Sequence, residues 1–380
     1  MIKELDIYKG KRVLVTGHTG FKGSWLSIWL NELGAEVIGY ALNPYTNKDN
    51  FVLTNLSTKI IDIRGDIRDY EKLKEVFEKY SPKFVFHLAA QPLVIDGYNN
   101  PKATFDINVG GTVNVLENCR HSKSVRAIIN VTSDKCYENK EWVWGYREVD
   151  PLGGDNPYSA SKACSELVII AYRNSFFNPQ DFKNHGKGLS SVRAGNAIGG
   201  GDWRQNRIIS DCIRSLEKGE PIQIRNPFST RPWQFVLEPL GGYLLLGAKM
   251  FENCEKYSDA WNFGPELSSI ITVKELVNIL LKKYGKENWI CEYKPNPIRE
   301  ATHLFLDITK TKFKLGWNPC FSIEEAVSKT VDWYKCYRNN SDMYNFCKKQ
   351  IYEYLEKCCL LYTSDAADEG LGVDLGGRRI

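Results

Sequence analysis

A tyrosine and a lysine four residues apart could act as an acid–base pair in this chain of 380 residues. Tyr158 and Lys162 follow Asn156-Pro157, a typical helix start, and their spacing places both side chains on one helix face. A phenol, with a pKa of about 10, is a poor base at neutral pH, but a neighbouring ammonium group lowers that pKa. The pair could then take the proton of a hydroxyl group while a hydride leaves the same carbon atom. An ordinary pair on a helix surface is the alternative.

Three glycines, Gly17, Gly20 and Gly23, follow the strand-like run Arg12–Val15 with the spacing G-x-x-G-x-x-G. Small residues let the backbone turn tightly and approach a diphosphate, which N–H groups and a helix dipole then bind. Spaced glycines alone can reflect turn chemistry. The strand before them and the amphipathic helix pattern Lys22–Leu33 after them favour a dinucleotide-binding site.

The second strand-like run, Glu36–Tyr40, leaves the choice between two dinucleotides open. The segment Gly39–Pro44 has neither an acidic residue for the ribose of NAD nor a basic residue for the 2′-phosphate of NADP. Asp66 and Ile67, after the third run, could hydrogen-bond to and pack against an adenine. A loop aspartate that caps the next helix explains Asp66 equally well.

A sheet with helices on both faces must position these groups, and the first 195 residues have the pattern of one. Short β-type runs alternate with amphipathic stretches, which is typical of a doubly wound parallel sheet of the Rossmann type. The predicted strands are Arg12–Val15, Glu36–Tyr40, Lys59–Ile63, Phe84–Leu88, Ala127–Thr132 and Leu189–Arg193. The predicted helices are Lys22–Leu33, Tyr70–Tyr80 with Asp69 as its N-cap, Lys102–Cys119 and Tyr158–Asn174.

The chain changes character after about residue 195, where its elements become shorter and proline more frequent. We expect residues 1–195 to form a dinucleotide-binding domain and residues 196–360 to form a smaller, mainly helical substrate lobe. Segments near 232–265 are expected to return to the main sheet. Residues 363–380 are rich in Gly, Asp and Ala without apolar periodicity, so we expect a disordered or non-native tail.

Composition argues against several classes of protein. The 50 Lys and Arg against 46 Asp and Glu leave a net charge of +4 without a basic block, which argues against a nucleic-acid partner. No apolar run is long enough to span a membrane, and the N-terminus lacks the apolar segment of a secretory signal. The 11 cysteines are scattered and the 5 histidines form no ligand cluster. We therefore expect mostly reduced cysteines, no metal site and a cytoplasmic location.

Several motifs together resemble the extended short-chain dehydrogenase/reductase family that acts on nucleotide sugars. They are the glycine segment, Tyr158 with Lys162, and the segments 87–91 and 108–112. Segments 132–139, 193–203 and 229–234 are similar to those of the CDP-glucose 4,6-dehydratase branch, and the resemblance covers roughly residues 10–355. It implies that NAD is held by Gly17, Thr19, Gly20, Phe21, Lys22, Gly23, Asp66, Ile67, Ala89, Ala90, Gln91, Asn108, Tyr158 and Lys162.

The resemblance implies a lyase that removes water from CDP-glucose without net redox change. Hydride passes from sugar C4 to NAD and returns at C6, Tyr158 takes the C4 hydroxyl proton, and Ser133 hydrogen-bonds to that oxygen. Asp134 is the implied acid for the departing C6 hydroxyl. Lys135 stands where related dTDP-glucose dehydratases have a glutamate, and it would act as the C5 base or stabilise the enolate. The alternative for Asp134 and Lys135 is a solvated pair.

The nucleotide end of the substrate is expected in the second lobe. By resemblance, Asn196 contacts the sugar-side phosphate, while Arg207, Arg231 and His303 bind the diphosphate and the pyrimidine nucleotide. The alternatives are surface ion pairs for the arginines and loop hydrogen bonds for Asn196 and His303. The product, CDP-4-keto-6-deoxyglucose, would serve the synthesis of deoxysugars in surface polysaccharides such as the O-antigen.

The assembly expected from the resemblance is a homodimer, with a tetramer possible. In similar proteins the helices at Lys102–Cys119 and Tyr158–Asn174 form a four-helix bundle across a two-fold axis. Apolar residues extend beyond one face of the second helix, at Ala163, Leu167, Ile170 and Ala171. Two other functions stay open: a 4-epimerase or dehydratase for a different nucleotide sugar, and a non-catalytic scaffold that senses a dinucleotide.

Overall fold

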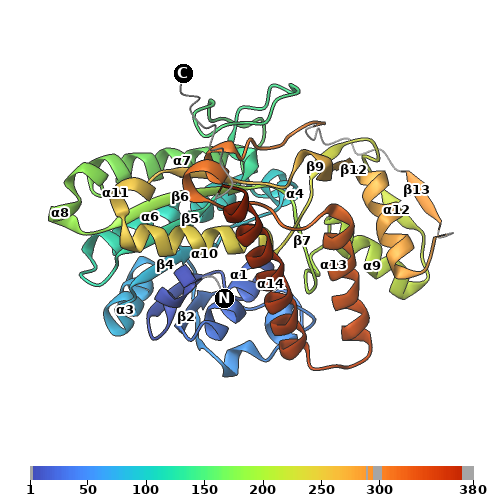
Figure 1. The fold of residues 1–380 in the computed structure, drawn as a ribbon, viewed down its shortest axis with the longest axis horizontal. Helices are drawn as coiled ribbons and strands as arrows, with labels where there is room; N and C mark the ends of the chain where they lie inside the picture. The colour runs from blue at the N-terminus through green and yellow to red at the C-terminus, as the bar shows by residue number, and fades with distance from the viewer. Residues whose placement is uncertain (1–2, 288–289, 294–301, 370–380) are drawn as a thin grey trace, which may run out of the picture.

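A parallel sheet of seven strands forms the centre of the computed structural model, which describes residues 3–287, 290–293 and 302–369 (Figure 1). The strand order is β11-β6-β5-β4-β1-β2-β3, and all neighbours are parallel. The predicted doubly wound fold is therefore confirmed. The strands are β1 (Arg12–Thr16), β2 (Glu36–Ala41), β3 (Ile61–Arg64), β4 (Phe84–His87), β5 (Ala127–Val131), β6 (Gly188–Ala194) and β11 (Ala260–Phe263).

All six predicted strands lie in this sheet, and their ends differ from the prediction by at most two residues. Their apolar runs are almost continuous because helices cover both faces of the sheet, so side chains of either orientation are buried. β11 is the segment from the second half of the chain that returns to the sheet, where it pairs with β6. It extends the sheet beyond the strands that the sequence analysis identified.

Helices α3 (Tyr70–Tyr80), α6 (Gly111–His121) and α7 (Pro157–Ser175) cover one face of the sheet. Asp69 caps α3, as predicted, by accepting a hydrogen bond from the backbone N–H of Lys72 at 3.1 Å. The side chains that these helices pack against the strands are Leu73, Val76, Phe77, Val115, Leu116 and Ile169, facing Leu14, Ile38, Val85, Ile128 and Leu189. α7 thus holds the predicted Tyr158 and Lys162 beside β5.

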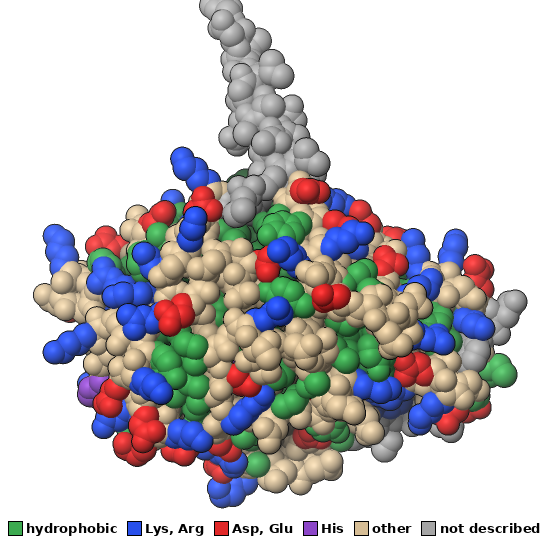
Figure 2. Space-filling view, turned by 90° about the horizontal axis from the view of Figure 1, so that it is seen from below, with side chains coloured by type: hydrophobic (Ala, Val, Ile, Leu, Met, Phe, Trp, Pro, Cys, Tyr) green, Lys and Arg blue, Asp and Glu red, His purple; other side chains and the backbone are tan. Residues whose placement is uncertain are grey.

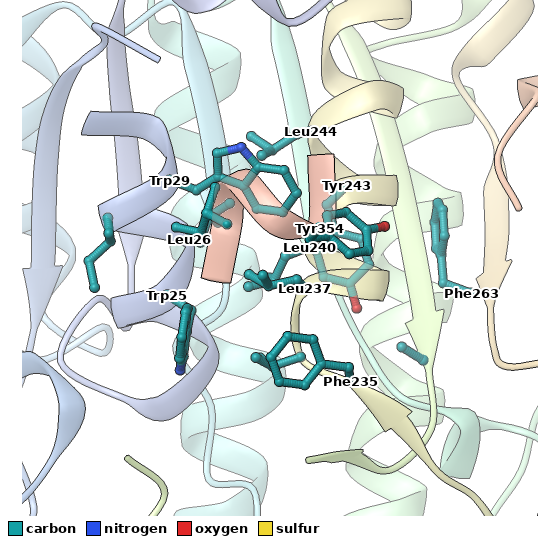
Figure 3. Close-up of a cluster of buried hydrophobic side chains, with 14 of the residues drawn as sticks. Trp25, Leu26, Trp29, Phe235, Leu237, Leu240, Tyr243, Leu244, Phe263 and Tyr354 are labelled. Atoms are coloured by element: carbon teal, nitrogen blue, oxygen red, sulfur yellow. The ribbon is translucent and has the colours of Figure 1, made fainter. Parts of the chain in front are cut away.

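Helices α1 (Phe21–Glu32) and α10 (Leu237–Glu252) cover the other face, and α14 (Met343–Glu369) packs against α1 (Figure 3). The Trp29 indole meets the Tyr354 ring edge-on, with 5.5 Å between ring centroids. Both rings are buried, and burial of an aromatic side chain stabilises the fold by roughly 1.5–3 kcal/mol. This layer fixes the position of α1, whose first turn belongs to the predicted glycine cradle.

The predicted helix Lys102–Cys119 is not one regular α-helix. It consists of α5 (Pro101–Phe105), a π-helical turn (Asp106–Gly110) and then α6. A short helix that the sequence analysis missed, α4 (Val94–Asn99), precedes them. π-helical turns often lie at functional sites, and this one holds Asn108.

Most elements of the second half of the chain form a group of helices and short two-stranded sheets that lies to the right in Figure 1, away from α3 and α6, whereas α10 and α11 (Cys254–Tyr257) lie against the main sheet. β7 pairs with β10, β9 with β12 and β8 with β13. The elements are β7 (Ala197–Ile198), α9 (Ile208–Lys218), β8 (Ile222–Ile224), β9 (Thr230–Pro232), β10 (Gln234–Phe235), β12 (Ile270–Thr272), α12 (Val273–Tyr284), β13 (Cys291–Tyr293) and α13 (Ile323–Arg338). Three further short helices are α2 (Asn50–Leu53), α8 (Phe182–His185) and α11 (Cys254–Tyr257).

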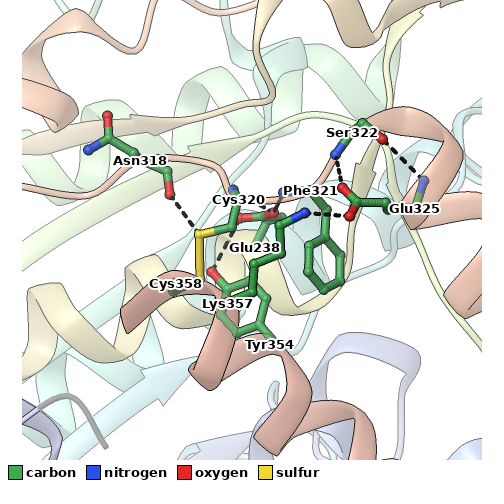
Figure 4. Close-up of a disulfide and its surroundings, with 9 residues drawn as sticks. All are labelled: Glu238, Asn318, Cys320, Phe321, Ser322, Glu325, Tyr354, Lys357 and Cys358. Atoms are coloured by element: carbon green, nitrogen blue, oxygen red, sulfur yellow. Dashed lines mark hydrogen bonds and ion pairs between the residues drawn. A yellow bond between two sulfur atoms is a disulfide. The ribbon is translucent and has the colours of Figure 1, made fainter. Parts of the chain in front are cut away.

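The C-terminal region differs from the prediction in two respects. α14 continues through Glu369, so the first residues of the predicted tail are helical, and residues 370–380 lie outside the described residues. Cys320 and Cys358 form a disulfide with their Cα atoms 5.8 Å apart (Figure 4), which is an exception to the expectation that most cysteines are reduced. The backbone N–H groups of Cys320 and Phe321 donate to the buried Glu238 carboxylate of α10 at 2.9 and 2.7 Å.

The surface carries both signs of charge. Figure 2 shows Lys and Arg side chains interspersed with Asp and Glu, without a continuous field of one sign on that face. Among the described residues, no helix has both the length and the apolar character that crossing a membrane requires. The described residues also contain no group of three or more His, Cys, Asp or Glu placed to hold a metal ion.

Gly200 provides a test of how the second half of the chain is locked to the first. An added Cβ at Gly200 would lie 1.9 Å from the ring of the buried Trp333 of α13. Gly200→Ala should therefore lower the free energy of unfolding by at least about 1–3 kcal/mol, measured by urea denaturation. The control is Gly110→Ala, because a Cβ there meets nothing within 4 Å and the backbone is helical. Equal urea midpoints for the two variants would contradict the packing described here.

Candidate active site

A cavity of about 870 Å³ opens at the carboxyl ends of the central strands, near the point beside β1 where the strand order reverses. Ligands of doubly wound sheets bind at this position. Most of the predicted site residues line the cavity: Gly17, Thr19, Gly20, Phe21, Lys22, Gly23, Asp66, Ile67, Ala89, Ala90, Ser133, Asp134, Lys135, Tyr158, Lys162, Asn196, Arg207 and Arg231. Gln91, Asn108 and His303 are not part of this lining. The fold thus brings together residues from both halves of the chain.

The glycine segment forms a tight cradle at the start of α1. Gly17 has a φ of +78°, and a Cβ there would lie 2.8 Å from the backbone nitrogen of Ala89. A Cβ on Gly23 would lie 2.1 Å from the carbonyl oxygen of Gly17. No side chain caps α1 at Gly20, so the first-turn N–H groups have no side-chain acceptor. The cradle fits a dinucleotide, because a diphosphate can approach the backbone and accept from those N–H groups.

The predicted adenine side of the cavity is formed by Asp66 and Ile67 together with Tyr40. The Asp66 carboxylate pairs with Arg68 at 2.6 Å, and the hydrogen bonds from Arg68 lower the pKa of Asp66. Asp66 also accepts from the backbone N–H of Arg68, while Asp69 caps α3, so the alternative that Asp66 caps the next helix is wrong. The adenine contact of Asp66 stays a prediction. The Tyr40 hydroxyl donates to the Asp66 backbone carbonyl at 2.9 Å.

His18 is a cradle residue to which the sequence analysis gave no role. Its Nε2 lies 2.8 Å from Asp62 of β3, and its ring fills the space that a side chain at Gly39 would occupy. Burial lowers the pKa of His18. The sequence contained one signal for this contact: Gly39 interrupts the apolar run of β2, and a glycine inside a strand often marks the close approach of another group.

Gln91 and Asn108 do not line the cavity, but they form hydrogen bonds that connect the segments of its wall. The Asn108 amide accepts from the backbone N–H of Gln91 at 2.8 Å and donates to the Ser161 hydroxyl at 2.8 Å. These bonds tie the loop after β4 and the π-helical turn to α7. Asn108 therefore helps to fix the helix that carries Tyr158 and Lys162.

Tyr158 and Lys162 share the cavity-facing side of α7, as their spacing predicted. Asn156 starts the helix by accepting from the backbone N–H of Ser159 at 3.0 Å. Burial raises the pKa of Tyr158 to about 12, against the lowering effect of the Ser133 hydroxyl. The prediction of a lowered phenol pKa is therefore wrong, because burial outweighs the lowering effects of the Ser133 hydroxyl and of Arg207. Burial lowers the pKa of Lys162 to about 8.

Ser133, Asp134 and Lys135 follow directly from the end of β5. The Ser133 hydroxyl donates to Asp134 Oδ1 at 2.9 Å and accepts from the backbone N–H of Lys135 at 3.2 Å. Asp134 is 2% exposed, and its Oδ2 has no hydrogen-bond partner among the described residues. Lys135 Nζ lies 4.0 Å from Asp134 Oδ1, and its side chain is 26% exposed. A buried acid with one free oxygen beside an amine is a suitable site for proton transfer.

A buried ion pair behind the site, between Glu166 and Arg193, was missed by the sequence analysis. Arg193 Nη2 of β6 donates to Glu166 Oε2 of α7 at 2.7 Å, and both side chains are buried. Thr132 also donates to Glu166, and the Tyr137 hydroxyl accepts from Arg193 at 2.7 Å. Burial alone would raise the pKa of Glu166, but Arg193 and the hydrogen bonds lower it. The position of Glu166, one turn after Lys162, was the only signal in the sequence.

Three of the four predicted substrate residues, Asn196, Arg207 and Arg231, line the cavity. Arg207 Nη1 pairs with Asp202 Oδ2 at 2.5 Å, and Asn196 Oδ1 is buried without a hydrogen-bond partner among the described residues. Arg231 is buried and donates to the backbone carbonyl of Thr230 at 2.7 Å. His303 lies outside the lining, where its Nδ1 shares a hydrogen bond of 2.9 Å with the Thr230 hydroxyl.

Comparisons with known proteins agree with this architecture. The family model described as GDP-mannose 4,6 dehydratase matches residues 14–330. The chain is 47% identical to a CDP-glucose 4,6-dehydratase of Salmonella typhimurium over 351 residues, which cover 92% of this chain and 98% of the relative.

Two solved structures share the fold of this chain. A dTDP-glucose 4,6-dehydratase of Streptomyces venezuelae with NAD bound is 24% identical, with a TM-score of 0.74 over 88% of this chain and 99% of that chain. A UDP-glucose 4-epimerase of Thermotoga maritima with UDP-glucose is also 24% identical, with a TM-score of 0.72 over 86% and 99%. At these identities the likenesses concern the fold alone.

Removing one partner of the buried ion pair should destabilise the protein strongly. Arg193→Met leaves the Glu166 charge buried and uncompensated, so the free energy of unfolding should fall by about 3–5 kcal/mol. The double variant Arg193→Met/Glu166→Gln should recover part of that loss, because the unpaired charge is gone. Urea denaturation of the single and double variants measures both effects. A double variant no more stable than Arg193→Met would contradict the inferred coupling.

Proposed function

We propose that this chain, which belongs to the GDP-mannose 4,6 dehydratase family, is a hydro-lyase that converts CDP-glucose into CDP-4-keto-6-deoxyglucose. One observation carries the choice of substrate: the 47% identity to the Salmonella CDP-glucose 4,6-dehydratase over nearly the full length of both chains. The cavity supports the same reaction, because it gathers a phenol, amines and a carboxylate oxygen without a partner beside a dinucleotide cradle.

NAD is the cofactor that the cradle and the comparisons support. The first-turn N–H groups of α1 would bind its diphosphate, and Asp66 and Ile67 would contact its adenine side. The Streptomyces dehydratase of the same fold has NAD bound. When bound, NAD supplies the acceptor for a hydride from sugar C4 and the donor that returns it at C6, so the reaction has no net redox change.

Tyr158 and Ser133 would act on the C4 hydroxyl group. Burial raises the pKa of Tyr158 and so keeps the phenol protonated at neutral pH, and positive charge must favour the phenolate before Tyr158 can accept a proton. Lys162, one helical turn further along α7, supplies part of that charge. Ser133 would hydrogen-bond to the C4 oxygen from the end of β5, beside Tyr158.

Asp134 and Lys135 would remove water across C5 and C6. Once C4 is a ketone, the C5 hydrogen is acidic, and Lys135 would take it as a proton. Protonated Asp134 would give its proton to the C6 hydroxyl, which leaves as water while a C5–C6 double bond forms. The free Oδ2 of Asp134 supports this role, because Ser133 and Lys135 occupy only the Oδ1 side of the carboxyl group.

An epimerase is the second candidate, because a UDP-glucose 4-epimerase shares the fold. It would need Tyr158 and Lys162 but no acid–base pair after Ser133. A non-catalytic scaffold would need neither pair, and the group of reactive residues around Asp134 argues against it.

We also propose that this dehydratase acts in the cytoplasm, in the synthesis of deoxysugars for surface polysaccharides such as the O-antigen.

The protein should turn over CDP-glucose in the presence of NAD. In D₂O the expected product is a 4-keto sugar nucleotide, detected by its absorbance in alkali, with one deuterium at C5 by mass spectrometry and NMR. An epimerase would give a stereoisomer without exchange at C5. That outcome, or turnover of a different sugar nucleotide only, would contradict the proposed reaction.

The Lys135→Met variant tests the proposed base in the same assay. Without the amine, turnover should fall by about 100-fold or more, and deuterium should no longer enter at C5. Lys140→Met is the matched control, since Lys140 is exposed on the following loop and is not part of the cavity lining. Unchanged turnover and exchange in Lys135→Met would rule out a catalytic role for this side chain.

We also propose a homodimer formed by the face that α5 and α7 share. Phe105 of α5 is 36% exposed and Leu167 of α7 is 56% exposed, and the two helices pack against each other. Exposed apolar side chains on adjacent helices favour association through a two-fold bundle. Ala163, which the sequence analysis placed on this face, is buried within the protomer, and Ile170 is half-buried.

Leu167→Glu should convert the dimer to a monomer in light-scattering measurements after gel filtration. A charge in an apolar helix–helix contact is desolvated without a partner, so association should weaken by at least about tenfold. Leu267→Glu is the control, because Leu267 is 70% exposed in the second half of the chain and lies outside α5 and α7. A wild-type protein that is already monomeric, or a dimeric Leu167→Glu variant, would contradict this interface.

A further inference from the structure

Lys22 presents an ammonium group to the cavity that no described residue engages. It lies in the first turn of α1 and lines the cavity, and no hydrogen bond or ion pair within the described part of the chain involves its Nζ. The other two lysines in the lining have neighbours: Lys135 lies 4.0 Å from Asp134, and Lys162 donates to the Val131 carbonyl at 3.4 Å. An unpaired cation that faces a cavity is a candidate for binding an anionic ligand.

The packing of α1 places Lys22 at the boundary between the cradle and the second half of the chain. The ring of Phe21 packs close to the backbone of Gly199, since a Cβ added at Gly199 would lie 3.1 Å from Phe21 Cζ. The Trp25 indole donates to the carbonyl oxygen of Gly200 at 3.0 Å. The same loop leads to Asp202, which pairs with Arg207. The first turn of α1 is therefore fixed against the loop that positions Arg207.

The charges around Lys22 show which part of the cavity it faces. Burial, followed by the positive charges of Arg207 and Lys162, lowers the pKa of Lys22 to about 8, and the negative charge of Asp134 opposes this shift. The positive charges of Lys22 and Arg207 thus repel each other, and burial of Lys22 reduces the screening of this repulsion by water. An anion bound near both groups would offset this unfavourable electrostatic energy. Lys22, Arg207, Asp134 and Lys162 all line the same cavity, so these charges belong to one site.

We infer that the Lys22 ammonium binds the sugar-side phosphate of the nucleotide-sugar diphosphate, opposite Arg207. The inference rests on the proposed function and adds a residue that contacts the substrate. In the nucleotide sugar, the phosphate nearest the sugar is the anion that lies between the nucleotide and the reacting carbons. The first turn of α1 would then serve two ligands, with its backbone N–H groups on the cofactor and its lysine side chain on the substrate.

The test compares CDP with CMP, which lacks the second phosphate, by calorimetry on the full-length protein saturated with NAD. In the Lys22→Met variant the affinity for CDP should fall by at least about tenfold, the effect of losing one charge-assisted hydrogen bond, while the affinity for CMP changes less than about twofold. Lys22→Arg should keep most of the CDP affinity, because it keeps the charge. Lys72→Met is the control, since Lys72 is exposed on α3.

NAD affinity, measured separately, distinguishes the two ligands that the first turn could serve. Weakened CDP binding together with unchanged NAD affinity in Lys22→Met supports the inference, and the unchanged NAD affinity shows that the variant is folded. Unchanged CDP affinity, with or without a loss of NAD affinity, or equal losses for CDP and CMP, would overturn it. If the wild-type protein binds another nucleoside diphosphate instead of CDP, the proposed substrate is wrong, and the same comparison of that diphosphate with its monophosphate still tests Lys22.

Discussion

Glu166 carries a buried negative charge at the point where α7, β5 and β6 meet, and the placement of the reactive groups depends on how that charge is satisfied. It pairs with Arg193 of β6 and accepts from Thr132, the residue before Ser133. Because one carboxylate binds both neighbours, α7 cannot rotate or slide relative to β5 without leaving charge unpaired in the interior. This constraint holds Tyr158 and Lys162 on one side of the cavity and Ser133, Asp134 and Lys135 on the adjacent side.

Close contacts between backbone segments provide the second constraint. The absence of a side chain at Gly17 lets the loop after β1 approach the loop after β4, and its absence at Gly23 lets the first turn of α1 approach the carbonyl oxygen of Gly17. The absence of a side chain at Gly200 lets the loop that joins the two halves of the chain pack against the ring of Trp333. The cavity walls are consequently closely packed where a dinucleotide would lie, and they include the segment that carries Arg207. One site formed by both halves can hold two nucleotides against each other.

Local patterns allowed much of this arrangement to be predicted. Three features could be predicted because each depends only on residues close together in the sequence: the spacing of Tyr158 and Lys162, the glycine segment and the apolar strands. The structure contains all three. The Glu166–Arg193 pair joins residues 27 positions apart, and the Cys320–Cys358 pair spans 38, so no local pattern indicates either partner. The direction of the Tyr158 pKa shift was wrong because it depends on burial, which the motif does not reveal.

The central claim is that these groups act on one sugar as a single site, so that a hydrogen removed from C4 returns to C6 of the same molecule. The most direct measurement uses CDP-glucose with deuterium at C4 and follows the label by NMR and mass spectrometry. The account predicts one deuterium in the C6 methyl group of the 4-keto product and no accumulation of reduced cofactor. Label that stays at C4 of a stereoisomer, or that leaves the sugar altogether, would contradict it.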